Sequence, residues 1–479
     1  MKVFFVWISL MACVSHGMEK KIQTLIHTLD PNLSIGVEVQ RLSNGEVLFA
    51  YNSQKPFVTA STQKILPAVV ALAASKDPML IPGLSLSFGD APFLTEVFYD
   101  DIKDETYFVF GGDPLLNIKN LEHILQSAQQ RGLMGKTLYV VMHNQKDKPF
   151  LPPVSSGCPY EGLDFCYGGI LLPAIINQNR VTFNFSGKSD AGKADVVLEE
   201  GQPTFAIQNM THVQEACFKD PEVGEWDQVQ RADLDFDGKT IMVRGCVPKT
   251  FEAKMCLPVH PYAMRAYIEA FMVEALKRCH IKVKIKFLDE VKDTKRFKKF
   301  SYSSSTLEKL LKLSLKDSNN LVTEALFSKL TQRASWPRNW DFAGRVLKAH
   351  IEKIFGVVFS KDDVIANGSG LSFYNTLTPA TLTHILRKAY LKFGQSFADL
   401  LSQAGVDGTL ENRLKNLSPC SRVSGKTGQL HGISNFAGYL QKTGKEPYVV
   451  SIFLTGNGSS TKERQKLVDD LLLMLLEEM

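Results

Sequence analysis

The sequence predicts an α/β protein of the α+β type, in which an antiparallel sheet flanked by helices is interrupted by a large β-rich insertion. Segments that alternate apolar and polar residues occur near both ends of the chain, together with apolar helical patterns. The stretch between them contains short β-like pieces separated by Gly, Pro and Asn residues. At 479 residues the chain is long enough for about two to three domains.

The N-terminal part of the predicted sheet begins with a hairpin. Residues 34–42 and 46–51 both alternate, and Asn44-Gly45 between them is a strong turn signal. After the segment that contains Ser61, residues 65–75 read ILPAVVALAAS, an alanine-rich pattern that predicts a buried helix. We therefore expect the helix to begin at or just before this serine.

The C-terminal part begins with a helical pattern over residues 260–279. Residues 281–287 then alternate lysine with apolar residues, which predicts a strand whose solvated lysine face discourages edge pairing. Three further strands are expected at 423–428, 435–442 and 448–456. The apolar-faced helix at the C-terminus carries several acidic residues, so we expect it to pack against this sheet rather than lie on a membrane.

The first residues match a short secretory signal peptide. Lys2 precedes an apolar run, and small residues follow, which favours cleavage after Gly17. A lipid anchor at Cys13 is the alternative. Either reading places the mature protein outside the cytoplasm, in the periplasm or an equivalent compartment. The expected domains are a signal peptide at 1–17, a discontinuous domain formed by 18–75 and 260–479, and an insertion at 76–259 with two subdomains.

The composition is that of a globular protein, with 44% hydrophobic and 22% charged residues. A formal net charge of +5 is mild, and the basic residues form no long stripe. The sequence therefore gives no support for nucleic-acid binding.

Export makes disulfides possible, and seven cysteines follow Cys13. An odd number leaves at least one thiol free or paired elsewhere. Proximity in sequence suggests the pairs Cys158–Cys166 and Cys217–Cys246. Cys256 and His260 have a metal-like spacing, but no second pair completes four ligands, so we expect no metal.

The first chemical motif is Ser61-Thr62-Gln63-Lys64. Residues three apart on a helix share a face, so the serine oxygen and the lysine amine can meet. Partial desolvation favours neutral lysine, which can accept the serine proton. This spacing alone has little specificity.

The second motif is Ser318-Asn319-Asn320, between two helical patterns. A hydroxyl and an amide two residues apart on a turn can point into one cleft. The alternative is a helix cap, for which Ser and Asn are preferred.

The third motif is Lys426-Thr427-Gly428, in a predicted strand. Lysine and threonine at an edge, followed by glycine, allow a peptide to lie alongside as an added strand. A phosphate-binding loop would need glycine where Cys420 stands, so we exclude it. The repeat of these letters at 442–444 is expected to be a hairpin turn.

Together and in this order, the three motifs match the set shared by penicillin-binding proteins and serine β-lactamases. The sequence resembles the large D-alanyl-D-alanine carboxypeptidase/endopeptidase family, the class C penicillin-binding proteins of type 4. Over half of the chain lies between Ser61 and Ser318, a gap that this family fills with an inserted region. Further segments resemble family segments: 110–116, 164–169, 244–248, 367–372 and 404–414.

The resemblance implies a penicillin-binding fold and a role for each motif residue. Ser61 would be the nucleophile and Lys64 its base, and Ser318, near Lys64, would pass the proton to the leaving amine. The remaining implied roles are substrate binding by Asn320, carboxylate binding by Lys426 and Thr427 beside Gly428, and an oxyanion hole from the N–H groups of Ser61 and Gln429.

The implied substrates are peptidoglycan stem peptides, the implied inhibitors are β-lactam antibiotics, and no metal or cofactor is required. Asn319 and Gln429 depart from the usual aspartate and from the usual Ser or Thr. His431, near the third motif, is expected to line the rim of the cleft. A β-lactamase or esterase on the same fold, and a non-catalytic cell-wall-binding protein, are the alternative functions.

Overall fold

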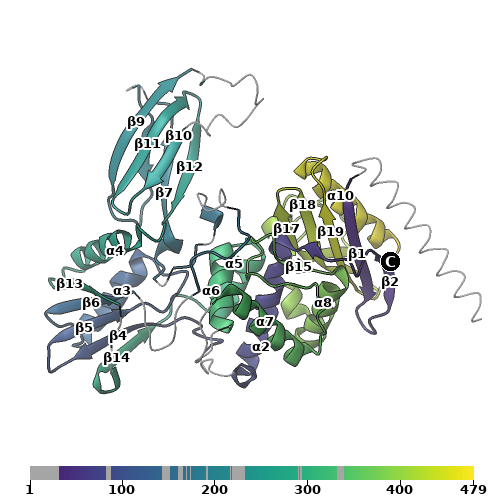
Figure 1. Cartoon of the computed structure of the whole chain (residues 1–479), viewed down its shortest axis with the longest axis horizontal. Coiled ribbons are helices and arrows are strands. Elements are labelled where there is room, and N and C mark those ends of the chain that lie inside the picture. The colour runs from purple at the N-terminus through teal and green to yellow at the C-terminus, as the bar shows by residue number, and fades with distance from the viewer. Residues whose placement is uncertain are drawn as a thin grey trace, which may run out of the picture.

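The computed structural model contains two parts that lie side by side (Figure 1). One is a six-stranded sheet with its helices, and the other is an elongated part built on three smaller sheets. The expected signal peptide and Cys13 lie outside the described residues, so both remain predictions. The structure describes residues 32–81, 88–142, 151–159, 166–168, 170–172, 174–189, 192–215, 217, 232–289, 291, 294–331 and 339–479.

The two ends of the described chain form one antiparallel sheet, in the order β16-β17-β18-β19-β1-β2. The expected hairpin and the three expected C-terminal strands are confirmed, and β1 pairs with β19 to join them. The strands are β1 (Ser34–Arg41), β2 (Val47–Tyr51), β16 (Ser402–Gln403), β17 (Ser421–Leu430), β18 (Ile433–Lys442) and β19 (Tyr448–Thr455). A small separate sheet pairs β3 (Phe57–Val58) with β15 (Thr376–Leu377).

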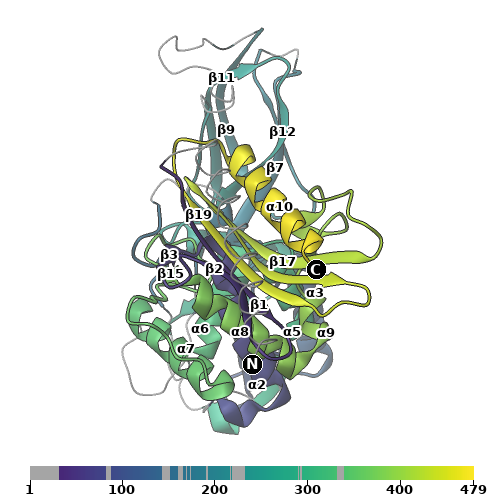
Figure 2. The same cartoon turned by 90° about the vertical axis from the view of Figure 1, so that its right-hand side faces the viewer.

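Helices cover both faces of the six-stranded sheet. The C-terminal helix α10 (Thr461–Glu477) crosses one face, as Figure 2 shows. Its buried leucine and valine side chains form one core with apolar residues of β1, β17, β18 and β19, which confirms the expected packing. The helix α8 (Pro379–Phe393) packs against β19 and β1 on the opposite face, followed by the short α9 (Gln395–Ala398).

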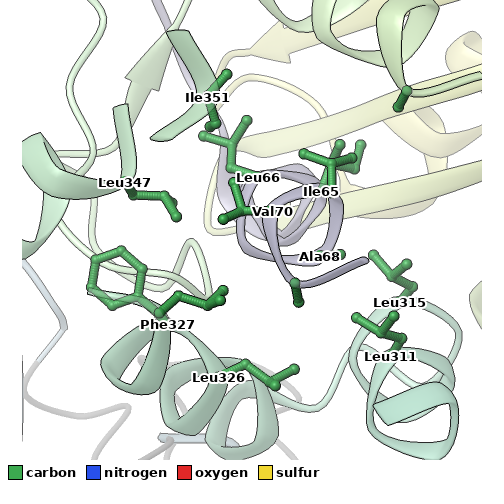
Figure 3. Close-up of a cluster of buried hydrophobic side chains, with 14 of the residues drawn as sticks. Ile65, Leu66, Ala68, Val70, Leu311, Leu315, Leu326, Phe327, Leu347 and Ile351 are labelled. Atoms are coloured by element: carbon green, nitrogen blue, oxygen red, sulfur yellow. The ribbon is translucent and has the colours of Figure 1, made fainter. Parts of the chain in front are cut away.

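The helix α2 (Ile65–Lys76) is buried on nearly all sides and confirms the predicted apolar helix. Three helices surround it: α5 (Leu307–Leu315), α6 (Asn320–Leu330) and α7 (Trp340–Phe355). Figure 3 shows their apolar side chains directed toward α2. The labelled members of this cluster are Ile65, Leu66, Ala68, Val70, Leu311, Leu315, Leu326, Phe327, Leu347 and Ile351. Ser61 lies in the short 3-10 helix that leads into α2, so this core helps to position the serine.

The elongated part contains a five-stranded sheet in the order β13-β6-β5-β4-β14 and two three-stranded sheets, β10-β11-β9 and β12-β7-β8. The helices α3 (Ile118–Gln130) and α4 (Met264–Arg278) pack together in its core. The strands are β4 (Thr95–Asp100), β5 (Glu105–Val109), β6 (Thr137–Val141), β7 (Arg180–Ser186), β8 (Asp195–Leu198), β9 (Ala206–Gln214), β10 (Ala232–Phe236), β11 (Thr240–Pro248), β12 (Glu252–Pro258), β13 (Lys284–Leu288) and β14 (Lys298–Tyr302).

The elongated part extends past residue 259, the expected end of the insertion. Beyond that residue, α4 packs in the same core as α3, β13 pairs with β6, and β14 pairs with β4. A helical or strand pattern shows that an element has an apolar face, but not which partner covers that face. We therefore propose that the catalytic part resumes near residue 303 rather than at 260.

The disulfides agree with one expected pair and correct the other. Cys217–Cys246 is confirmed. The expected pair Cys158–Cys166 is wrong, because Cys166 is bonded to Cys256 of β12, a residue distant in sequence but adjacent in the fold. Cys256 is therefore no metal ligand, and no group of three His, Cys, Asp or Glu side chains in the described part could hold a metal ion. The free thiols in this part are Cys158, Cys279 and Cys420.

Candidate active site

The first motif lies on a short 3-10 helix, η1 (Ala60–Lys64), that leads into α2. Lys64 Nζ lies 2.8 Å from Ser61 Oγ, so the structure brings these two side chains together. Ala60 has a φ of 44°, a left-handed conformation that is uncommon for residues other than Gly. Ala60 is the first residue of η1, so Ser61 lies in the first turn of this 3-10 helix.

Lys64 is fully buried and has three hydrogen-bonding neighbours. Besides Ser61, its Nζ lies 2.6 Å from Asn320 Oδ1 and 2.6 Å from the carbonyl oxygen of Ser369. An amide oxygen and a carbonyl oxygen can only accept hydrogen bonds. A neutral amine therefore uses its two N–H groups on these oxygens and directs its lone pair at Ser61.

The surroundings of Lys64 favour that neutral form. Burial holds the pKa of Lys64 well below its usual value, and the nearby cation Lys426 lowers it further. Glu324 acts in the opposite direction through its negative charge. Burial and Lys426 both favour the neutral amine, which is the form that can accept the proton of a hydroxyl group.

Glu324 is a site residue that the sequence analysis did not identify. Its carboxylate accepts hydrogen bonds from the backbone N–H groups of Gly368 at 3.0 Å and Ser369 at 2.9 Å. These bonds hold the turn whose Ser369 carbonyl contacts Lys64. The signal in the sequence was a single carboxylate in the apolar stretch LVTEALF. It is 3% exposed, and burial raises its pKa.

Ser318 lies in the connection between α5 and α6, with a φ of 57°. Its hydroxyl accepts a hydrogen bond from Lys426 Nζ at 3.0 Å. The implied neighbour of Ser318 was Lys64, whereas the hydrogen bond in this structure is with Lys426. Lys64 therefore contacts Ser61, and Lys426 contacts Ser318.

Asn319 and Asn320 divide two roles between them. The side chain of Asn319 accepts from the N–H of Val322 at 3.0 Å and caps α6, so the helix-cap interpretation applies to this residue. Asn320 instead points into the site, where Oδ1 contacts Lys64 and Nδ2 donates to the carbonyl oxygen of Tyr167. Both ends of this amide are therefore fixed in orientation.

Lys426 is also fully buried, and its Nζ donates to the carbonyl oxygen of Thr427 at 2.9 Å as well as to Ser318. Burial lowers the pKa of Lys426 to about 7. Thr427 Oγ1 donates to Thr409 Oγ1 at 2.7 Å. This lysine is therefore partly charged at neutral pH and gains charge when an anion arrives.

The part of β17 that carries the third motif has one edge without a strand partner in the described structure. β16 pairs with Ser424 and Gly425 only, whereas the whole of β17 pairs with β18. Gly428 lies against η1, where a Cβ atom would come within 2.8 Å of the Thr59 carbonyl oxygen. Gln429 is exposed, and its Oε1 accepts from Gln465 Nε2 at 2.8 Å.

A cavity of about 320 Å³ joins the motifs. Its walls include Ser61, residues of β17 and two residues of α10. No aspartate or glutamate lines it. His431 lies in the turn between β17 and β18 and is not among the lining residues. The residues that line it are Ser61, Ser318, Thr409, Arg413, Thr427, Gly428, Gln429, Ser434, Asn435, Gln465 and Val468.

An antiparallel sheet flanked by helices, with a serine–lysine pair beside an unpaired strand edge, defines a penicillin-binding serine hydrolase. More specifically, the chain belongs to the D-Ala-D-Ala carboxypeptidase 3 (S13) family, whose model matches residues 19–475. The expected family and fold class are thereby confirmed.

Individual relatives agree with this assignment. The chain is 24% identical over 454 residues to the D-alanyl-D-alanine carboxypeptidase DacB of Haemophilus influenzae, covering 92% of this chain and 89% of that protein. The crystal structure of penicillin binding protein 4 from the same organism superposes with a TM-score of 0.74 at 21% identity, covering 95% of this chain and 98% of the other. Its complex with a β-lactam gives a TM-score of 0.71, with the same identity and coverage. None of the helices in the described part of this chain is both long and apolar enough to cross a membrane.

Proposed function

We propose that this enzyme hydrolyses D-alanyl bonds in peptidoglycan stem peptides, outside the cytoplasm, through an acyl-enzyme on Ser61. The observation that carries the proposal is the buried amine of Lys64, 2.8 Å from Ser61 Oγ and held by two fixed acceptors. Such an amine is arranged to remove a hydroxyl proton and has no other evident partner for its lone pair.

In the acylation step, Ser61 Oγ forms a bond to the carbonyl carbon while Lys64 takes the hydroxyl proton. The backbone N–H groups of Ser61 and Gln429 stabilise the negative oxygen, and such a donor typically contributes about 2.7–4 kcal/mol. The C–N bond then breaks as Ser318 delivers its proton to the leaving amine, and the proton that Lys64 accepted from Ser61 passes on to restore the Ser318 hydroxyl. Lys426, bonded to Ser318, stabilises the serine oxygen as it loses that proton.

Substrate binding uses the groups that surround these serines. The second N–H of Asn320 Nδ2 is available to the acyl part of the substrate, since Tyr167 takes only one of the two. The leaving carboxylate binds near Lys426 and Thr427, and its charge raises the pKa of Lys426 above about 7. Water then attacks the ester of Ser61 while Lys64 takes a proton from it. Lys64 returns this proton to Ser61 Oγ as the bond to the acyl carbon breaks and the shortened peptide leaves.

A β-lactam should acylate the same serine, as the complex of the Haemophilus influenzae protein with a β-lactam suggests. Incubation with a penicillin followed by mass spectrometry is expected to show one adduct, located on Ser61. The variant Ser61→Ala should acquire none. An adduct on the variant would contradict the assignment, and rapid loss of the adduct from the wild type would favour a β-lactamase.

Digestion of purified muropeptides tests the natural reaction. D-alanine release from monomers reports carboxypeptidase action, and splitting of cross-linked dimers reports endopeptidase action. We expect at least one of the two products. If the folded enzyme forms neither, the hydrolase proposal is wrong.

A further inference from the structure

The cavity continues beyond the third motif into a region with no assigned role. There Gln429 occupies the position after the motif glycine, and its side chain is bound to Gln465 of α10. The hydroxyl group that this position supplies in the common form of the motif is therefore absent. A different hydroxyl lies nearby.

Ser434 of β18 is the direct cross-strand partner of Gln429. Residues paired in this way project from the same face of a sheet, with Cβ atoms about 4.5–5.5 Å apart. Ser434 is 3% exposed and lines the cavity, and its Oγ has no hydrogen-bond partner within the described part of the chain. Ser434 thus combines an unused hydroxyl with a place in the cavity wall, so its O–H group can donate to an atom bound there.

Arg413 lines the same region of the cavity, after the short 3-10 helix η9 (Gly408–Leu410). Its Nε and Nη2 donate to the carboxylate of Asp469 on α10, and Nη2 also donates to the carbonyl oxygen of Gln465. Nη1 has no partner among the described residues. The guanidinium group is thus fixed by two of its nitrogens, and the third remains available to a ligand.

We propose that Arg413 Nη1 and Ser434 Oγ form a subsite for the carboxylate of the leaving residue. This subsite rests on the proposed function, because a D-alanyl leaving group carries that carboxylate beside its amine. Lys426, with a pKa of about 7, provides only part of a positive charge at neutral pH. The Arg413 guanidinium stays protonated at neutral pH, and its free Nη1 can donate hydrogen bonds to the leaving carboxylate. It therefore adds carboxylate binding that Lys426 alone does not provide. Asp469 balances its charge, so selectivity comes from hydrogen-bond direction.

Two thioester substrates with the same D-alanyl acyl group test the subsite. One releases a thiol that carries a carboxylate, and the other releases the methyl ester of that thiol. Wild-type enzyme should prefer the carboxylate, measured as the ratio of the two kcat/KM values. Ser434→Ala and Arg413→Lys should each lower this ratio about tenfold, the effect of losing one hydrogen bond to a charged group. The kcat/KM for the thioester that releases the neutral thiol should fall less than the value for the one that releases the carboxylate.

Ser451→Ala is the matched control. Ser451 lies on β19, is fully buried and likewise has a hydroxyl without a partner in the described chain, but it does not line the cavity. This variant should keep the wild-type ratio. Equal ratios for the Ser434 and Ser451 variants, or a wild-type enzyme with no preference for the carboxylate, would overturn the subsite while leaving the hydrolase intact. Absence of hydrolysis of both esters and of muropeptides would instead refute the proposed function.

Discussion

Lys64 and Lys426 are two buried amines that must be in opposite protonation states for the proposed reaction. Lys64 has to be neutral to accept the Ser61 proton, whereas Lys426 has to be charged to hold a carboxylate. Burial is the largest influence on both, and it lowers both pKa values. The pKa of Lys64 is lowered further by the charge on Lys426. A protonated Lys426 therefore helps to keep Lys64 neutral.

This arrangement predicts a bell-shaped pH dependence for acylation by a penicillin. The rate should rise with pH as Lys64 loses its proton through a lowered pKa. It should fall above about pH 7, where free Lys426 becomes neutral. The second-order acylation rate constant, measured across this range, reports both limbs of the free enzyme. A penicillin whose carboxylate is esterified should show only the rising limb, and identical profiles for both compounds would contradict the role of Lys426.

The variant Glu324→Gln tests the electrostatic role of Glu324. Removing the negative charge should lower the pKa of Lys64 and move the rising limb of acylation to lower pH. A single amide oxygen also leaves Gly368 N–H or Ser369 N–H without its partner, which should cost about 1–3 kcal/mol of unfolding free energy. Thr323→Ser, at a neighbouring buried position of α6, is the control and should keep the wild-type pH profile. A rising limb that does not move would refute the coupling.

The motifs predicted side chains that the structure brings together, but not the groups that orient them. Ser61, Lys64 and Asn320 could be found because the motifs Ser-x-x-Lys and Ser-x-Asn place these residue types at fixed, short spacings. Glu324 could not, because one carboxylate in an apolar helix has the same pattern whether it is solvated or buried. The carbonyl oxygen of Ser369 leaves no signal at all, since every residue carries one and only the turn decides where it points.

At the scale of single elements, periodicity was sufficient for the strands and helices. The hairpin at the N-terminus and the last three strands follow the predicted alternation. The helix α4 was also predicted as a helix, but its partner was not, because the apolar face of α4 could pack on any layer. Nor could the pattern show the 3-10 turn of η1, which depends on the unusual φ of Ala60.

Two glycines in identical tripeptides allow a direct test of the third motif. Gly428→Ala should place a Cβ within 2.8 Å of the Thr59 carbonyl, separating β17 from η1. We expect a loss of about 1–3 kcal/mol in stability and a severe loss of penicillin acylation. Gly444, in the hairpin turn after Lys442 and Thr443, has open space around its missing Cβ but a φ of 75°.

Gly444→Ala should therefore cost about 1 kcal/mol of unfolding free energy from backbone strain, with normal acylation. Thermal unfolding and labelling by a fluorescent penicillin measure the two effects separately. If both variants label equally well, the contact between β17 and η1 is not essential to the site.

At the scale of the whole molecule, a segment of the expected insertion contacts the candidate active site. Tyr167 lies in the segment 166–168 and accepts a hydrogen bond from Asn320 through its carbonyl oxygen. The preceding residue, Cys166, is bonded to Cys256 on β12. The disulfide therefore ties β12 to the segment 166–168, and a hydrogen bond ties this segment to the Asn320 amide, which contacts Lys64. This connection could not be predicted from the sequence, because the two cysteines are separated by 90 positions.

Removing this bridge should weaken the site without abolishing the fold. The double variant Cys166→Ser/Cys256→Ser frees the segment around Tyr167, so the amide of Asn320 loses one of its fixed partners. We expect acylation by a fluorescent penicillin to slow by about tenfold, the effect of about 1.4 kcal/mol. Reductant should slow the wild type similarly and leave the double variant unchanged.

Cys217→Ser/Cys246→Ser, which removes the bridge at β11, is the matched control. It loses a stabilising bridge, worth about 2–4 kcal/mol as is typical, yet should acylate at the wild-type rate and keep its response to reductant. If both double variants acylate equally slowly, the disulfides act only on stability, and the proposed link from the insertion to Asn320 is wrong.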